Sequence, residues 1–230
     1  MSGCCGPGED GRYSEVFDER FASSVARRYR RRGLSRPARH IVEALDELGL
    51  AGASVLEVGG GVGEIQLELL ARGARETVNL ELSDAYEAAA DALHRESGIQ
   101  GRVTRMVGVN LADASTIDLQ PADYVVLHRV VCCYPDFERL LGSAAEHARR
   151  ALVFSHPPRT WLTRSAVALG NAWMAVRGRS YRGYVHSPEA MLAVLTAHGL
   201  VLRSTQRSDR WRIVVAVREP VAARLPERVP

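Results

Sequence analysis

The chain has 230 residues, a net charge of +3 and 46% apolar residues, which is ordinary for one large globular domain or one domain with a lid. All thirty basic residues are arginine, because the sequence contains no lysine. This excludes chemistry that depends on a lysine amine: Schiff-base aldolases, pyridoxal-phosphate enzymes, and the phosphate loops and kinases that need a lysine.

The charges are unevenly distributed along the chain. Residues 20–40 hold eight arginines and no acidic residue. Residues 41–158 hold nine arginines against eighteen acidic residues, and residues 159–212 hold nine arginines against two. An acidic middle is therefore flanked by two basic segments.

The ends of the chain and its cysteines indicate a cytoplasmic protein. No charged start followed by an apolar run predicts a secretory signal, and no uncharged stretch has the length of a transmembrane helix. The four cysteines form two adjacent pairs, Cys4-Cys5 and Cys132-Cys133, and adjacent cysteines rarely pair with each other. We therefore expect reduced thiols.

The first fifty residues predict a tail and a helical cap. Residues 1–12 are turn formers and are expected to be disordered. Apolar residues then recur every four positions and predict one helix with a single apolar stripe: Tyr13, Phe17, Phe21, Val25 and Tyr29. A second amphipathic helix is predicted from Pro37 to Gly49, so residues 13–50 form an N-terminal helical cap.

Beyond the cap, strands and helices alternate. The pattern predicts strands at 54–58, 77–80, 102–107, 123–127 and 151–154, with helices near 64–70, 84–96 and 136–148 between them. It then predicts helices at 160–176 and 187–198 and closing strands at 200–204 and 211–217. Alternation implies right-handed crossovers, so we expect an α/β fold over residues 51–218 with a doubly wound, mostly parallel seven-stranded sheet, followed by a tail at 219–230.

A glycine-rich loop follows the first predicted strand. A dinucleotide fingerprint that starts with Gly59 and Gly61 needs a third glycine at position 64, where Glu64 stands and would repel a pyrophosphate. The spacing fits a different pattern, an acid followed by alternating glycines: Glu57, Gly59, Gly61 and Gly63. An acid before the glycines suits a ligand that has a cationic end and no phosphate, such as S-adenosylmethionine.

A second acid stands where a ribose would bind. Glu81 follows Gly63 by eighteen residues and ends the second predicted strand. A carboxylate there can accept hydrogen bonds from both ribose hydroxyls. The alternative is a solvated acid after a strand.

Residues 53–218 resemble the class I S-adenosylmethionine-dependent methyltransferases. The resemblance rests on the glycine loop, on Glu81 and on the closing pair of strands. It implies that Glu57 and the three alternating glycines line the methionine end of the cofactor, and that Glu81 holds the ribose. The acid that usually faces the adenine in this family is missing, and Asn110 or Asp113 could take its place.

The segment after the fourth strand faces the methyl group in this family. His128 could be a general base, could orient the acceptor, or could only cap backbone groups at the sheet edge. Arg129 could clamp an acceptor carboxylate through two parallel hydrogen bonds. His156, after the fifth strand, is a further candidate.

We expect a lid of apolar side chains over the acceptor. The predicted lid helix spans residues 160–178 and has arginines around it. The candidate lid and substrate residues are Tyr13, Tyr29, Tyr134, Trp161 and Trp173. Apolar walls rimmed by cations suit a flat acceptor that carries an anion, and the layout is weakly similar to the magnesium-protoporphyrin O-methyltransferase branch, which esterifies a propionate. The alternative is a structural helix with solvated arginines.

Three other functions stay open. Cys132-Cys133 begins a predicted helix near the acceptor side and, with Cys4-Cys5, could hold a thiol or metalloid substrate, which resembles the arsenite methyltransferases. The arginines at 20–32 raise RNA as a substrate, although the apolar stripe on that helix and the acidic middle argue against nucleic acid. A non-catalytic cofactor-binding scaffold is the third. The preferred prediction is a methyltransferase that methylates an oxygen of a small, anionic and partly apolar acceptor and has no metal-binding residues.

Overall fold

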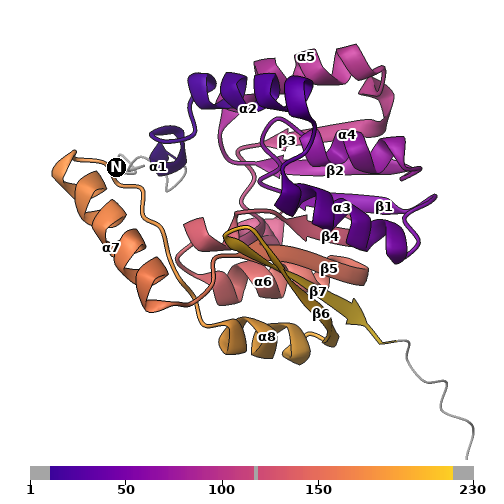
Figure 1. The fold of residues 1–230 in the computed structure, drawn as a ribbon. Coiled ribbons are helices and arrows are strands. Elements are labelled where there is room, and N and C mark those ends of the chain that lie inside the picture. The colour runs from indigo at the N-terminus through magenta and orange to yellow at the C-terminus, as the bar shows by residue number, and fades with distance from the viewer. Residues whose placement is uncertain (1–10, 117–118, 220–230) are drawn as a thin grey trace, which may run out of the picture.

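Seven strands form one sheet in the order β3-β2-β1-β4-β5-β7-β6 (Figure 1). The strands are β1 (Ser54–Val58), β2 (Glu76–Glu81), β3 (Val103–Val107), β4 (Ala122–Leu127), β5 (Ala148–His156), β6 (Leu200–Ser208) and β7 (Trp211–Arg218). The computed structural model describes residues 11–116 and 119–219. Cys4-Cys5 and most of the predicted tails at 1–12 and 219–230 lie outside the described residues.

The direction of the strands confirms the predicted sheet. β1 to β5 pair in parallel, whereas β7 runs antiparallel to both β5 and β6. The chain leaves β1 toward β2 on one side and returns to β4 on the other side of β1. This reversal opens a crevice at the carboxyl ends of β1 and β4, where doubly wound sheets bind their ligands.

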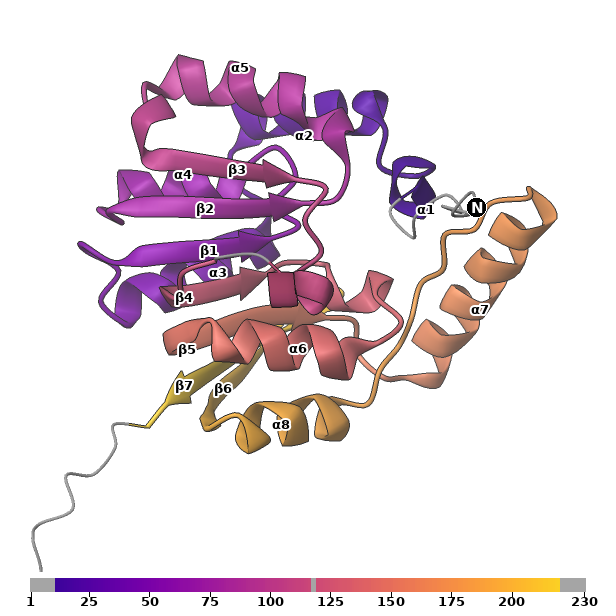
Figure 2. The ribbon, with the colours of Figure 1, turned by 180° about the vertical axis from the view of Figure 1, so that it is seen from behind.

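Helices cover both faces of the sheet (Figure 2). They are α1 (Gly11–Ser14), α2 (Glu19–Arg32), α3 (Arg36–Glu47), α4 (Glu64–Ala71), α5 (Glu87–Ser97), α6 (Phe137–Glu146), α7 (Trp161–Val176) and α8 (Pro188–Ala197). On one face α3 and α4 pack on the sheet, with Ile41 and Leu45 buried against Val55. On the other face α6 and α8 pack on the sheet, and Leu140 of α6 and Met191 of α8 lie in one hydrophobic core with buried residues of the strands.

The N-terminal stripe is broken into two helices, so the prediction of one continuous helix from Tyr13 to Tyr29 is wrong. The chain turns after α1, where the Phe17 N–H donates to the Tyr13 carbonyl. Asp18 then starts α2 because its side chain accepts a hydrogen bond from the Phe21 N–H at 2.8 Å. A side chain that caps a new helix competes with continuation of the old one.

A buried tyrosine ties α3 to the sheet. Tyr124 lies in β4, is fully buried, and donates its hydroxyl to the Leu48 carbonyl at 2.6 Å, just beyond the end of α3. We expect Tyr124→Phe to lower the free energy of unfolding by about 1 kcal/mol, because the mutation removes the hydrogen bond of the tyrosine hydroxyl, whereas the Leu48 carbonyl keeps its bond from Arg150 at 2.7 Å. Urea unfolding of the two proteins measures the difference, and an unchanged unfolding midpoint would show that this bond contributes nothing.

Candidate active site

The backbone of the loop after β1 lies close to neighbouring side chains, and glycine occupies the positions of closest approach. Gly59, Gly61 and Gly63 have φ angles of 64°, 56° and 81°, in the left-handed region that favours glycine. A Cβ on Gly59 would also lie 2.7 Å from the Val130 side chain. Glycine at these three positions therefore allows the left-handed backbone conformation of the loop and places no side chain against its neighbours.

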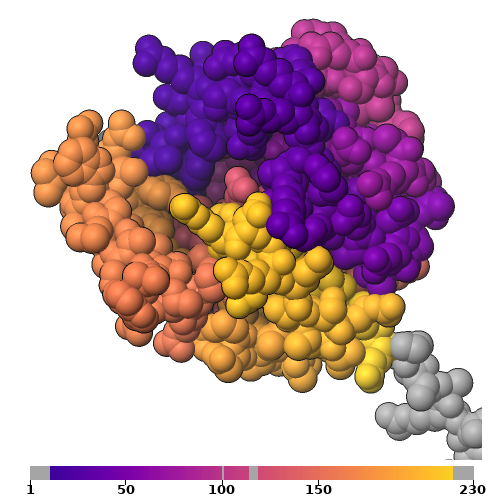
Figure 3. Space-filling view, in the orientation of Figure 1, coloured from indigo at the N-terminus to yellow at the C-terminus, as the bar shows by residue number. Residues whose placement is uncertain are grey.

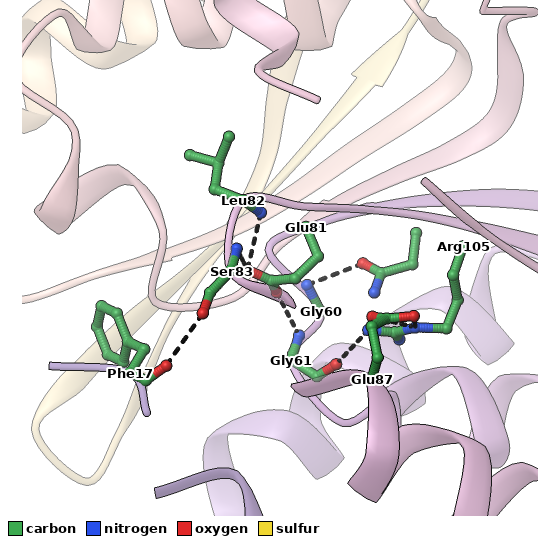
Figure 4. Close-up of polar contacts among 9 residues, drawn as sticks. Phe17, Gly60, Gly61, Glu81, Leu82, Ser83, Glu87 and Arg105 are labelled. Carbon is green, nitrogen blue, oxygen red and sulfur yellow. Dashed lines mark hydrogen bonds and ion pairs between the residues drawn. The ribbon is translucent and has the colours of Figure 1, made fainter. Parts of the chain in front are cut away.

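Side chains from β2 and β3 hold this loop in place (Figure 4). The Gly60 N–H donates to Asn79 Oδ1 at 3.0 Å, and the Gly61 N–H donates to Glu81 Oε2 at 2.9 Å. Arg105 donates to the Gly61 carbonyl at 2.9 Å and is fixed by an ion pair with Glu87 at 2.7 Å. Sequence reasoning missed Asn79 and Arg105, although Asn79 lies two residues before Glu81 and so shares its face of β2.

Glu57, the penultimate residue of β1, is a buried acid. Its side chain is 1% exposed, and its Oε2 has no hydrogen-bond partner among the described residues. Burial raises the pKa of Glu57 to about 8, and the nearby Glu64 carboxylate adds to that rise. A buried acid with an unused oxygen is a site for a cationic group, because a cation lowers the cost of ionising it.

Glu81 is oriented by the backbone around it. Its Oε1 accepts hydrogen bonds from the Leu82 and Ser83 N–H groups at 2.9 and 3.2 Å. These bonds fix the carboxylate at the carboxyl end of β2, facing the cavity that the glycine loop borders. Burial nevertheless raises its pKa.

The cavity at the crevice has a volume of about 300 Å³. Its floor is the glycine loop and the ends of β1, β2 and β4, and its roof comes from the N-terminal helices. The roof residues are Tyr13, Phe17, Phe21, Ser24, Val25 and Arg28. In Figure 3 the molecular surface is hollowed between the N-terminal helices and the β6–β7 hairpin.

Among the predicted acceptor residues, His128 and Arg129 both line the cavity. His128 Nδ1 lies 3.0 Å from Ser155 Oγ, which also accepts the Arg129 N–H at 2.8 Å. Burial, together with the charges of Arg129 and Arg28, lowers the pKa of His128 to about 3. His128 is therefore neutral at pH 7 and is too weak a base to keep a proton that it removes.

Asn110 and Tyr134 line the cavity on its β3–β4 side. The Asn110 amide donates to the Tyr134 hydroxyl at 3.0 Å and to Asp113 Oδ2 at 2.7 Å. Asp113 is exposed and pairs with Arg139 instead of lining the cavity. Of the two candidates for the adenine side, only Asn110 borders the cavity.

Four other predicted site residues lie outside this cavity. The Tyr29 hydroxyl donates to Glu68 of α4 at 3.1 Å, where Tyr29 packs between α2 and the core. His156 is buried at the end of β5, with its Nδ1 against the Pro157 carbonyl. Trp161 and Trp173 belong to α7, no residue of which lines the cavity. The predicted lid helix thus stands apart from the cavity. The roof of the cavity is formed by α1 and α2 instead.

The cysteine pair does not begin an α-helix, contrary to prediction. Cys132 and Cys133 lie in a 3-10 turn (Val131–Cys133), and α6 starts later, at the cap formed by Asp136. Cys133 lines the cavity, and its Sγ lies 2.9 Å from the Tyr181 hydroxyl. The described part of the chain contains no cluster of three or more metal-binding side chains.

Comparison with known proteins decides the family. A family model described as a methyltransferase domain matches residues 26–205, which is most of the chain. The protein belongs to this methyltransferase family. It is an S-adenosylmethionine-dependent enzyme. Its fold is that of solved methyltransferases with bound S-adenosylmethionine (SAM) or S-adenosylhomocysteine (SAH).

Solved structures of low sequence identity share the methyltransferase's fold. The magnesium protoporphyrin IX methyltransferase of Synechocystis PCC 6803 with bound SAH is 20% identical, with a TM-score of 0.67 over 91% of this chain and 94% of that chain. An O-methyltransferase family protein from Burkholderia thailandensis is 21% identical, with a TM-score of 0.66 over 90% of this chain and 64% of that chain. No curated protein sequence matches the chain. Over the described ranges, no helix of the methyltransferase is long and apolar enough to cross a membrane.

The residues present fit the cofactor. S-adenosylmethionine carries an amino group and a sulfonium, and Glu57 offers a buried oxygen without a partner. Glycine at position 60 allows the loop to lie close to this acid, because a Cβ there would lie 2.6 Å from both Glu57 Oε2 and Asn79 Oδ1. Glu57 and the glycine loop would hold the methionine end, and Glu81 would hold the ribose.

Proposed function

We propose that the enzyme methylates a carboxylate oxygen of a small, partly apolar acceptor. The roof offers the rings of Tyr13, Phe17 and Phe21, and the cations Arg28 and Arg129 line the same cavity. The observation that carries the proposal is the Arg129 guanidinium: it is largely buried, and its Nε has no hydrogen-bond partner in the described structure. A guanidinium with an unused donor suits a carboxylate, whose two oxygens match the planar arrangement of guanidinium N–H groups.

Arg129 is held in an unusual backbone conformation. Its φ angle is 62°, which costs a non-glycine residue about 1 kcal/mol or more. The bond from its N–H to Ser155 and the stacking of its guanidinium 5.2 Å from the Trp211 ring support this conformation. Such strain commonly accompanies function, and here it supports Arg129 as a substrate-binding residue.

The weak basicity of His128 favours a carboxylate over an alcohol. S-adenosylmethionine supplies an activated methyl group, so the protein chiefly has to align the attacking oxygen with it. A carboxylate is already ionised at neutral pH and needs no base, whereas an alcohol must lose a proton. Because the pKa of His128 is about 3, we assign this residue to positioning through Ser155 and not to proton removal.

We expect Arg129→Gln to reduce methyl transfer about 100-fold while leaving the affinity for S-adenosylhomocysteine within about threefold of the wild type. The variant keeps hydrogen-bond donors but loses the charge that would hold the acceptor. The assay follows the transfer of tritiated methyl groups from S-adenosylmethionine to an extract of small metabolites. Calorimetry measures the affinity of each protein for S-adenosylhomocysteine.

Arg203→Gln is the matched control, because Arg203 is exposed on β6 and lies outside the cavity. It should transfer methyl groups at the wild-type rate. Wild-type activity in Arg129→Gln would contradict the proposal. An equal loss of S-adenosylhomocysteine binding would assign Arg129 to the cofactor instead.

A thiol or metalloid acceptor is the second candidate, and it is favoured by the position of Cys133 in the cavity. Cys132 Sγ lies 3.7 Å from Cys133 Sγ, so the two sulfurs could hold one soft atom between them. Cys133→Ser should leave methylation of a carboxylate intact and should abolish methylation of a metalloid. Comparing the two activities in this variant separates the candidates.

A further inference from the structure

The outer side of α7 is an apolar surface that no described part of the chain covers. We call it the α7 face. Its five residues are Trp161, Leu162, Leu169, Trp173 and Val176, which are 74%, 60%, 73%, 56% and 83% exposed. No residue of α7 is buried, although α7 is a sixteen-residue helix. Large apolar side chains gathered at this exposure mark a surface that meets another phase or partner.

The α7 face is continuous and carries no charge. At 100° per residue, Trp161, Leu169 and Trp173 fall within an arc of about 120°. The other two residues of the face lie inside that arc, and Arg164 lies well outside it. In Figures 1 and 2 α7 stands away from the sheet, at the edge of the molecule.

The inner side of α7 fixes which way the face points. Asn171 exchanges two hydrogen bonds with the backbone of Gly183, at 2.8 and 2.9 Å. The segment that follows the helix is held in turn by Glu15, which accepts from the Ser180 N–H at 2.8 Å and from the Ser180 hydroxyl at 2.9 Å. The helix is therefore attached at Asn171, on the side away from the α7 face, and the apolar face points outward.

The charge around the helix is mainly positive. Residues 159–186 contain five arginines and no acidic residue: Arg159, Arg164, Arg177, Arg179 and Arg182. The Arg177 guanidinium lies 4.5 Å above the Trp173 ring, at the border of the α7 face. An uncharged apolar face with tryptophans, bordered mainly by arginines, has the composition of helices that lie in the interface of an anionic bilayer.

We propose that the α7 face docks on an anionic lipid surface, with the helix lying in the plane of the interface. Its tryptophan and leucine side chains enter the boundary between headgroups and acyl chains, and the arginines contact lipid phosphates. A second copy of the chain fits this surface less well, because pairing two α7 helices would bring together two sets of five arginines, which outnumber the acids near them, Glu15 and Glu189. The inference does not depend on which acceptor the enzyme methylates.

The test is co-sedimentation of the full chain with vesicles of phosphatidylcholine, either alone or with phosphatidylglycerol at about 30 mol%. We expect the protein to sediment with the anionic vesicles only, and the tryptophan emission to shift to shorter wavelength. Leu169→Glu places a charge in the centre of the face and should weaken binding about tenfold or more. The fold should be unaffected because this side chain is exposed.

Leu202→Glu is the matched control, since Leu202 is another exposed leucine, at 48%, on β6 and away from α7. It should bind anionic vesicles like the wild type. The proposal is overturned if the wild type stays in the supernatant, if it binds neutral vesicles equally, or if both variants lose binding alike. A dimer in sedimentation equilibrium that Leu169→Glu dissociates also overturns it, in favour of a second copy of the chain.

Discussion

Gly61→Arg is expected to weaken binding of S-adenosylhomocysteine by about 100-fold or more. Gly61 lies in the middle of the loop, and its N–H and carbonyl are both used by Glu81 and Arg105. A Cβ there would lie 3.3 Å from the Tyr86 ring, so the longer arginine side chain must extend into the cavity. Calorimetric titration of the two purified proteins measures the change.

The loss must be separated from general backbone strain. Gly52→Arg is the control, because Gly52 also has a positive φ, 74°, but has open space around its Cβ position and does not line the cavity. Both variants should lose stability through the same left-handed conformation. Only Gly61→Arg should lose binding, and full binding by Gly61→Arg would show that the glycine loop does not hold the cofactor.

Binding of S-adenosylmethionine at pH 7 is expected to release about one proton from Glu57. In the ligand-free protein, burial raises the pKa of Glu57 from 4.5 to about 8, so the carboxyl is mostly protonated at pH 7. The positive charges of the cofactor favour the ionised form and lower that pKa again. Titrations at pH 7 in phosphate and in Tris, whose ionisation enthalpies differ, give the number of protons from the difference in observed heat.

Glu57→Gln is the control for this release. The variant has no proton to lose, so its binding heat should not depend on the buffer, and its affinity should be lower than that of the wild type. A folded-state pKa above the unfolded value means that protonated Glu57 contributes stability below pH 4.5, and that this contribution is lost as the pH rises through about 8. Glu57→Gln should therefore lose less stability than the wild type as the pH increases from 5 to about 9. Equal proton release by both proteins would assign it to another group.

Much of the fold could be predicted because buried strands and amphipathic helices have different periods. The predicted seven-stranded, mostly parallel sheet is confirmed, and β7 is its reversed strand. Apolar residues that recur every four positions predict one continuous N-terminal helix, whereas the cap formed by Asp18 starts a new helix within that pattern. The exposure of α7 could not be predicted, since the spacing of Trp161 and Trp173 is the same whether the face meets a core or solvent.

Part of the candidate site could likewise be predicted from the sequence, and part could not. The glycine loop and Glu81 follow one another in a short stretch, so their relation can be read from the sequence. Asn79 and Arg105 act on the loop from neighbouring strands, at a distance in sequence that only the sheet register closes. The apolar sequence of α7 predicts that this helix covers the cavity, whereas the roof comes from α1, α2 and the turn between them.

The central claim is methyl transfer to a carboxylate in this cavity, and one measurement addresses it directly. The wild-type enzyme is incubated with S-adenosylmethionine carrying a deuterated methyl group and a small-metabolite extract, and mass spectrometry follows products that carry the label. The account predicts a labelled product that mild alkali hydrolyses back to a carboxylic acid, as a methyl ester must be. A labelled product that survives alkali, or no labelled product, would contradict it.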